Sequence, residues 1–139
     1  MHDDFQEFNL HPHIRRKTCR IRRISAVWTS IITGLEITYD INHESAASLY
    51  NYTIAAYNEF ASMSTNEIRK DDFINSIQGT YDENGITGLI FGTHLKGSII
   101  FGQSRGDTFE VKLDDDSEVI AFRGVFSTKG LHGLMVYSV

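Results

Sequence analysis

The sequence of 139 residues predicts an all-β protein. Short segments rich in Ile, Val, Phe, Tyr and Thr follow one another from residue 20 onward, and Gly, Asn or Asp separates them. Strands that recur about every eight to twelve residues with such turn residues between them are typical of a sandwich, a barrel or a prism. The chain contains eleven glycines and one proline, so glycine is expected to form most of the turns.

The strands themselves are expected where apolar residues alternate or run together. The segment from Leu35 to Ile41 is a clear case, because every other residue is apolar and should face the core. The expected strands cover residues 21–28, 35–41, 73–81, 86–93, 98–102, 108–113, 118–126 and 131–139. The expected turns lie at Thr33-Gly34 and at residues 83–85, 94–97 and 114–116.

Two segments are harder to assign. Residues 44–63 would place Leu49, Tyr52 and Phe60 on one face of a helix, but residues 50–56 also alternate as a strand would. We expect strands there because the neighbouring pattern is β throughout. Residues 1–19 are expected to form an N-terminal arm or an edge strand. The remainder, 20–139, is expected to be a single domain, since domains commonly have about 100–150 residues.

Composition excludes several classes of protein. The single cysteine, Cys19, cannot form an internal disulfide, so a disulfide-stapled scaffold is excluded. No apolar run reaches the roughly 18–20 residues that a membrane-spanning helix needs. The first ten residues are acidic, whereas a signal peptide is basic and then apolar. We therefore expect a cytoplasmic protein with no membrane span.

The net charge of −5 conceals a basic segment at residues 14–23. This segment holds six of the thirteen basic residues and no acid, which leaves seven bases against eighteen acids, or −11, elsewhere. Arg and Ile alternate in its second half, which predicts a half-buried strand with a basic face. No aromatic residue interleaves with the bases, so nucleic acid is not an expected partner. Binding of another polyanion by residues 14–23 stays open as an alternative.

Ordered motifs along the chain resemble those of the jacalin-related lectins. A strand of the pattern I-x-x-I-x-G follows a polar residue at 72–79, and a strand of the form L-x-F-x-T comes next at 89–93. The motifs that follow in the family's order are Phe101-Gly102, Gly106, Phe109-Glu110-Val111 and Phe122-Arg123-Gly124. Residues 21–24, 37–40 and 131–137 resemble its early and terminal strands. The resemblance covers about residues 20–139 and rests on order and spacing.

The resemblance implies a β-prism of three four-stranded antiparallel sheets that binds carbohydrate without catalysis. In this family, loops at one end of the prism hold the sugar, and mannose or a mannose-containing glycan is the default ligand. The implied carbohydrate-binding residues are Thr128, Lys129, Gly130, Leu131 and His132, with Asp82, Glu83 and Asn84 opposite them.

The sequence departs from the family's pattern at this implied site. His132 stands where the family has an aspartate, and the N-terminal region lacks the family's glycine-rich loop. A carboxylate accepts hydrogen bonds from two sugar hydroxyls, whereas a neutral histidine accepts only one. An alternative hypothesis is therefore a β-prism that has lost sugar binding and acts as a protein-interaction or oligomerisation module.

The sequence contains no catalytic motif. It has no phosphate-binding loop, no zinc-ligand spacing and no G-x-S-x-G. We expect no enzyme activity, no cofactor and no metal site. The expected partners are glycans or glycoproteins, and a homo-oligomer is expected because weak single sugar sites gain strength through multivalency.

Overall fold

The computed structural model describes residues 2–3, 19–41, 44–50, 61–111, 113 and 116–138, and every regular element in these residues is a β-strand. The strands are β1 (His2–Asp3), β2 (Cys19–Trp28), β3 (Ile32–Ile41), β4 (Glu44–Tyr50), β5 (Ser62–Glu67), β6 (Ile74–Asp82), β7 (Gly85–Thr93), β8 (Ser98–Gly102), β9 (Asp107–Val111), β10 (Val119–Phe126) and β11 (Leu131–Ser138). No helix long and apolar enough to cross a membrane is found in the described part of the chain.

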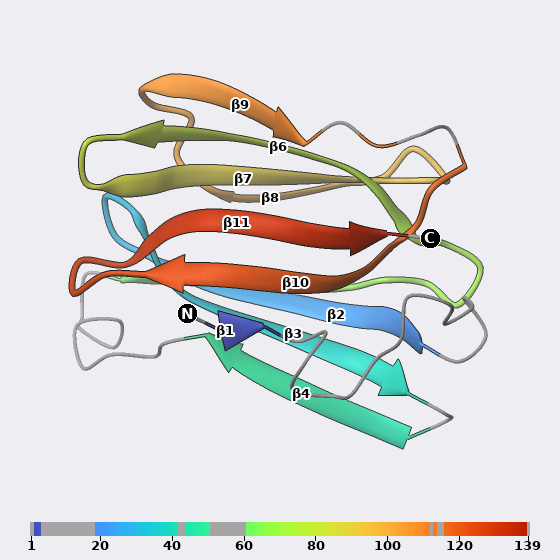
Figure 1. Cartoon of the computed structure of the whole chain (residues 1–139). Coiled ribbons are helices and arrows are strands. Elements are labelled where there is room, and N and C mark those ends of the chain that lie inside the picture. The colour runs from blue at the N-terminus through green and yellow to red at the C-terminus, as the bar shows by residue number, and fades with distance from the viewer. Residues whose placement is uncertain are drawn as a thin grey trace.

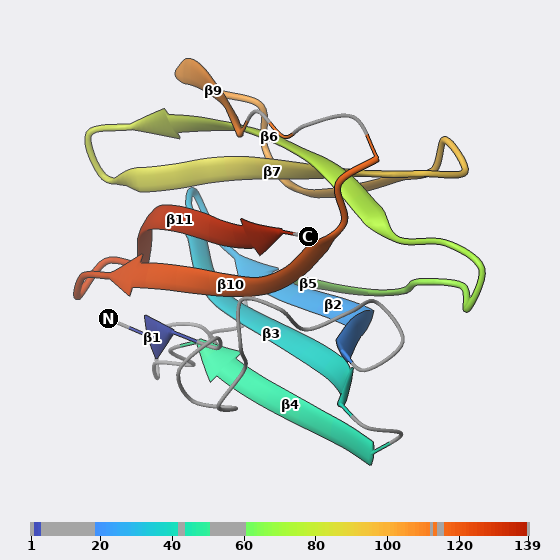
Figure 2. The same cartoon turned by 45° about the vertical axis from the view of Figure 1, so that its right-hand side comes forward.

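The strands form three antiparallel sheets around a common core, as Figures 1 and 2 show. One sheet has the order β1-β10-β11, a second has β4-β3-β2-β5, and a third has β8-β7-β6-β9. In Figure 1 the β10–β11 hairpin lies between the other two sheets. The expected all-β class and three antiparallel sheets are thus confirmed, although the first sheet has three strands, not four, among the described residues.

Most expected strands are present with ends shifted by a few residues, but the expected turn at Thr33-Gly34 is wrong. Both residues lie inside β3, and Gly34 pairs with Val27 of β2. The chain reverses instead at residues 29–31. Ile32 already belongs to the return strand, and its side chain is fully buried in the core.

The strand interpretation of residues 44–63 is confirmed for β4 and for the start of β5. Residues 51–60 lie outside the described residues. At the N-terminus, β1 pairs with β10 at the edge of its sheet.

Each sheet contains one hairpin, β2–β3, β6–β7 or β10–β11, whose first strand carries a bulge near its start. In β2–β3 the register passes from Ile21↔Tyr39 to Arg23↔Thr38, which leaves Arg22 as an extra residue. The β6–β7 and β10–β11 hairpins have the same irregularity at the corresponding place. A bulge places two residues opposite one and so changes the face to which the following side chains point. The spacing I-x-x-I in β2 and β6 therefore buries both isoleucines of each pair.

A second bulge lies at the start of the return strand of each hairpin. The extra residue there is Thr33 in β3, Thr87 in β7 and His132 in β11. In every case a buried aliphatic residue precedes it and a glycine follows, which gives Ile-Thr-Gly, Ile-Thr-Gly and Leu-His-Gly. The three hairpins are thus internal structural repeats, and His132 occupies the position that threonine holds in the other two.

The core lies between the three sheets. Phe91 of β7 packs edge-on against Phe101 of β8, with centroids 6.1 Å apart, and against Phe122 of β10, with centroids 5.8 Å apart. Edge-to-face contacts of this kind are a favoured geometry for aromatic pairs. Tyr39 and Ile24 add fully buried side chains from the second sheet. The described core is therefore continuous across all three sheets, and it fixes the ends of the hairpins relative to one another.

Candidate functional site

Four turns gather at one end of the molecule, which is the left-hand end in Figure 1. They are residues 29–31, 83–84, 103–106 and 127–130, and we call this region the loop end. Backbones approach closely there. A Cβ atom on Gly85 would lie 2.6 Å from the carbonyl oxygen of Leu131, and one on Gly130 would lie 2.5 Å from that of Ile32. Only glycine leaves room for this contact between hairpins from different sheets.

Ile31 fills the centre of the loop end. It occupies the repeat position that glycine holds in the other two hairpins, at Gly85 and Gly130. Its side chain is only 4% exposed. Its Cδ1 atom lies 3.4 Å and 2.9 Å from the places where these glycines would carry a Cβ. One bulky residue and two glycines therefore close this end of the core.

A polar network connects three of the four turns. The Asp82 carboxylate accepts a hydrogen bond from the backbone N–H of Asn84 (2.8 Å) and pairs with Arg105 Nη1 (2.7 Å). Arg105 Nη2 donates to the carbonyl oxygen of Ser30 (2.8 Å). The Asn84 hydrogen bond first, and then the Arg105 charge, hold the pKa of Asp82 below its usual value against the opposing effect of burial. Asp82 is therefore an anion at neutral pH.

The turn between β10 and β11 brings a second cation to this network. The N–H of Ser127 donates to the carbonyl oxygen of Gly130 (2.9 Å), and the N–H of Lys129 donates to Ser127 Oγ (3.0 Å). The turn directs Lys129 toward the β6–β7 turn, where its Nζ donates to Asn84 Oδ1 (2.9 Å). An ammonium has three N–H donors, so two of them remain available to a ligand in this geometry.

A hollow of about 280 Å³ lies beside the network, and Tyr81, Phe109 and His132 contribute to its wall together with three smaller or aliphatic residues. Tyr81 is 43% exposed, and its ring lies 6.2 Å from that of Phe109. His132 is exposed, whereas its repeat counterparts Thr33 and Thr87 are buried. The hollow thus combines an exposed aromatic ring with an imidazole, next to the Asp82 end of β6.

Comparison with known proteins identifies the chain. The sequence profile of the Jacalin-like lectin domain matches residues 7–137. The chain belongs to the jacalin-like lectin family. No curated protein sequence matches it.

Solved structures of other lectins resemble this jacalin-like lectin domain. The artocarpin–mannotriose complex has a TM-score of 0.72 at 16% identity, over 86% of this chain and 83% of that one. The lectin MPA complexed with T-antigen disaccharide has a TM-score of 0.70 at 20% identity, over 86% and 91% of the two chains. Frutapin, a lectin from Artocarpus incisa, has a TM-score of 0.73 at 18% identity, over 86% and 83%. At these identities the likeness shows the fold.

The structure of this lectin domain gives the expected site residues different environments. Asp82, Asn84 and Lys129 belong to one network, whereas His132 faces the neighbouring hollow. Leu131 is fully buried, so its side chain belongs to the core. The others lie in the turns of the loop end, where Gly130 is buried and Glu83 and Thr128 are exposed.

Two groups of the network were not expected from the sequence, namely Arg105 and the Ser30 carbonyl. Arg105 lies 23 residues from Asp82 along the chain, in a loop for which no role was expected. It reaches Asp82 because the sheet order places β9 directly beside β6. No local sequence pattern indicates this contact. In the structure, the φ of +98° at Gly106 allows a tight approach to the backbone of Tyr81.

Proposed function

We propose that this jacalin-like lectin domain binds a glycan at its loop end, without catalysis. The observation that carries the proposal is the juxtaposition of the hollow beside Tyr81 with the Asp82–Asn84–Lys129 network. A pyranose ring has hydroxyls that need directional donors and acceptors, and C–H faces that pack on apolar or aromatic surface. The loop end offers both kinds of contact within one small region.

Each group retains capacity for hydrogen bonds to a sugar. A carboxylate has about four lone-pair sites, so Asp82 can accept further bonds beside those from Asn84 and Arg105. Lys129 has two remaining donors, and His132 adds an acceptor or a donor at the rim of the hollow. Each neutral hydrogen bond contributes about 0.5–1.5 kcal/mol net, so one site should be weak. This supports multivalent binding by a homo-oligomer.

Mannose-type glycans are the first ligands to test. Similar structures include complexes of artocarpin with mannotriose and with methyl-α-mannose, and the mannose-binding lectin from Champedak. The T-antigen disaccharide bound to the lectin MPA supports a galactose-type glycan as the second candidate.

One observation favours the alternative of a prism without sugar binding. The cation of Arg105 already pairs with the Asp82 carboxylate, and His132 supplies no second carboxylate. A chain of this kind would serve as a protein-interaction or oligomerisation module. Self-association that occurs without any glycan binding would favour this alternative.

The test is a titration of the full chain with mannotriose and with T-antigen disaccharide, in which calorimetry and NMR measure the binding. Tyr81→Ala should weaken binding about fivefold, since it removes apolar contact of about 1 kcal/mol. Leu95→Ala is the matched control, because Leu95 is similarly exposed at 47% but lies in the turn between β7 and β8, at the other end of the prism. The proposal would be contradicted if neither sugar bound at millimolar concentration. It would also be contradicted if the two variants lost the same amount of binding affinity.

A further inference from the structure

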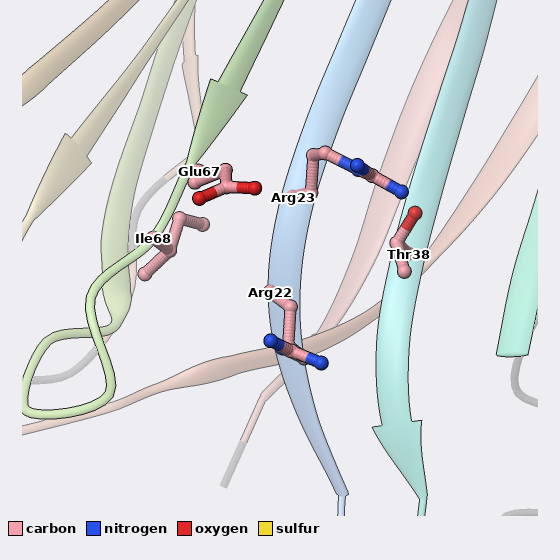
Figure 3. A pocket seen from close by; sticks show the side chains of 5 residues that line it. All are labelled: Arg22, Arg23, Thr38, Glu67 and Ile68. Atoms are coloured by element: carbon pink, nitrogen blue, oxygen red, sulfur yellow. The ribbon is translucent and has the colours of Figure 1, made fainter. Parts of the chain in front are cut away.

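We propose that the solvent-facing side of β2, β3 and β5 carries a second saccharide site, which takes a sugar carboxylate. Five residues line a hollow of about 150 Å³ there (Figure 3). They are Arg22, Arg23, Thr38, Glu67 and Ile68. None of them belongs to the loop end, and the proposal does not depend on glycan binding there.

The bulge in β2 creates the pair of arginines. Because Arg22 is the extra residue, both Arg22 and Arg23 are exposed between the buried Ile21 and Ile24. Regular alternation would instead turn one of the two arginines toward the core. Two adjacent guanidinium groups thus project from the same side of one strand.

The two arginines have different partners. Arg22 is held by Asp40, with Nε 3.3 Å from Oδ2 and Nη1 3.4 Å from Oδ1. Arg23 has no ion pair or hydrogen bond through its guanidinium to another described residue. In Figure 3 it points across β2 toward Thr38, whereas the Glu67 carboxylate lies on the other side of β2. Arg23 is therefore the group that can form a bidentate contact with a carboxylate.

The remaining residues of the hollow suit a sugar ring. Glu67, which pairs in register with Arg23, supplies an acceptor for hydroxyl groups. Ile68 directly follows β5 and is half-buried. It stays beside β2, because its N–H donates to the carbonyl oxygen of Arg22 (2.7 Å). It offers apolar surface to the C–H face of the ring, and the Thr38 hydroxyl adds a polar group opposite.

Charge selects the class of ligand. Glu67 in the hollow and Asp40, which pairs with Arg22 beside it, offset the two arginines, so these four residues together have a formal charge of zero. Highly sulfated chains and nucleic acids gain affinity chiefly from protein cations that no neighbouring anion balances. Here such a polyanion would meet two carboxylates, so it is not the ligand that the site favours. A sugar with one carboxylate and several hydroxyls matches one free guanidinium, one acceptor and one apolar side chain. Uronic acids and sialic acids share this chemistry.

The second site is separate from the loop end. Arg23 lies six positions before residue 29, where the turn begins, and in an extended strand this spacing corresponds to about 20 Å. A ligand of one or two sugar rings cannot contact both places. Loss of binding at one site therefore leaves the other site measurable.

The experiment is an NMR titration of the full ¹⁵N-labelled chain with four probes. These are a glucuronic-acid disaccharide, its glucose counterpart, sialyllactose and lactose. At least one acidic probe should shift the amide signals of Arg23, Thr38, Glu67 and Ile68, with affinity about tenfold above that of its neutral counterpart. Which acidic probe binds identifies the source of the carboxylate.

Variants test the role of the free arginine. Arg23→Gln should remove the tenfold preference for the acidic probe and leave the melting temperature unchanged, since the side chain is exposed. Lys96→Gln makes the same change in net charge in an exposed turn of the third sheet and should have no effect. Three results would overturn the proposal: no shifts at these residues, equal affinity for acidic and neutral probes, or tighter binding of a heparin oligosaccharide with steep salt dependence.

Discussion

At the scale of single residues, two aspartates organise opposite ends of the prism. Asp82 ends β6 at the loop end, where its carboxylate ties the turn of β6–β7 to Arg105. Asp72 precedes β6 at the other end and accepts hydrogen bonds from the N–H groups of Phe73 (2.9 Å) and Leu95 (3.0 Å). Because Leu95 belongs to the turn between β7 and β8, Asp72 fixes that turn against the start of β6.

Replacement of Asp72 is expected to destabilise the fold. Asp72→Ala leaves two backbone N–H groups without their acceptor, which should cost about 1–3 kcal/mol of unfolding free energy. Asp71→Ala is the control, since Asp71 is exposed and its only ion pair among the described residues is with the exposed Arg69. Chemical denaturation at pH 7 measures both variants. Equal stability of the two would show that the contacts of Asp72 contribute nothing.

The same residue predicts a dependence of stability on pH. Burial raises the pKa of Asp72, but hydrogen bonds, first from Leu95 N–H, together with the charge of His94, outweigh it, so the pKa lies below the ordinary value of 3.8. A lowered pKa in the folded state stabilises the protein above the unfolded value, and this stabilisation is lost as pH falls through the folded value. The stability difference between wild type and Asp72→Ala should therefore shrink below pH 3.8. A constant difference down to pH 2 would contradict this assignment.

At the scale of the elements, the repeated hairpin explains the arrangement of the loop end. Each return strand begins with an aliphatic residue, an extra residue in a bulge, and a glycine. The residue just before this triplet lies at the centre of the loop end, as Ile31, Gly85 or Gly130. The three positions are not interchangeable, because the isoleucine occupies the space that the two glycines leave.

Gly130→Ala should therefore destabilise the protein, whereas Gly133→Ala should not. Gly130 has a φ of +151°, and an added Cβ would lie 2.5 Å from the carbonyl oxygen of Ile32. Strain at such a backbone position costs about 1–3 kcal/mol. An added Cβ at Gly133 would meet only ordinary contacts, the nearest at 3.7 Å. Thermal unfolding of both variants gives the comparison, and equal melting temperatures would show that the loop end adapts without cost.

Sequence patterns predicted the strands that bury apolar side chains better than those that do not. β5 has the polar sequence SMSTNE with every side chain exposed or half-buried, so it shows no apolar period. It forms a strand because its backbone pairs with β2 from Trp28 to Arg23.

The resemblance of ordered motifs correctly indicated a jacalin-like lectin. The ion pair of Asp82 with Arg105 could not be predicted, because it depends on the sheet order and not on any local pattern.

At the scale of the whole molecule, one core holds the three sheets and hence both proposed sites in place. Phe91 is fully buried and contacts Phe101 within its own sheet and Phe122 of the β10–β11 sheet. The second sheet reaches the same core through Ile24 and Tyr39. The loop end draws turns from all three sheets, so its geometry depends on this shared packing. The three hairpins should consequently unfold together.

Phe91→Ala tests that dependence. Loss of a large buried aromatic side chain from a packed core costs about 3–5 kcal/mol, through lost apolar burial and the cavity that remains. Ile100→Ala is the control on the neighbouring strand β8, because Ile100 is 61% exposed and its replacement should change stability by less than about 0.5 kcal/mol. Denaturant unfolding followed by tryptophan fluorescence, which reports on Trp28 in β2, and by circular dichroism should give one coincident transition for each variant. Two separate transitions would show instead that the sheet of β2 unfolds independently of the sheet that contains Phe91.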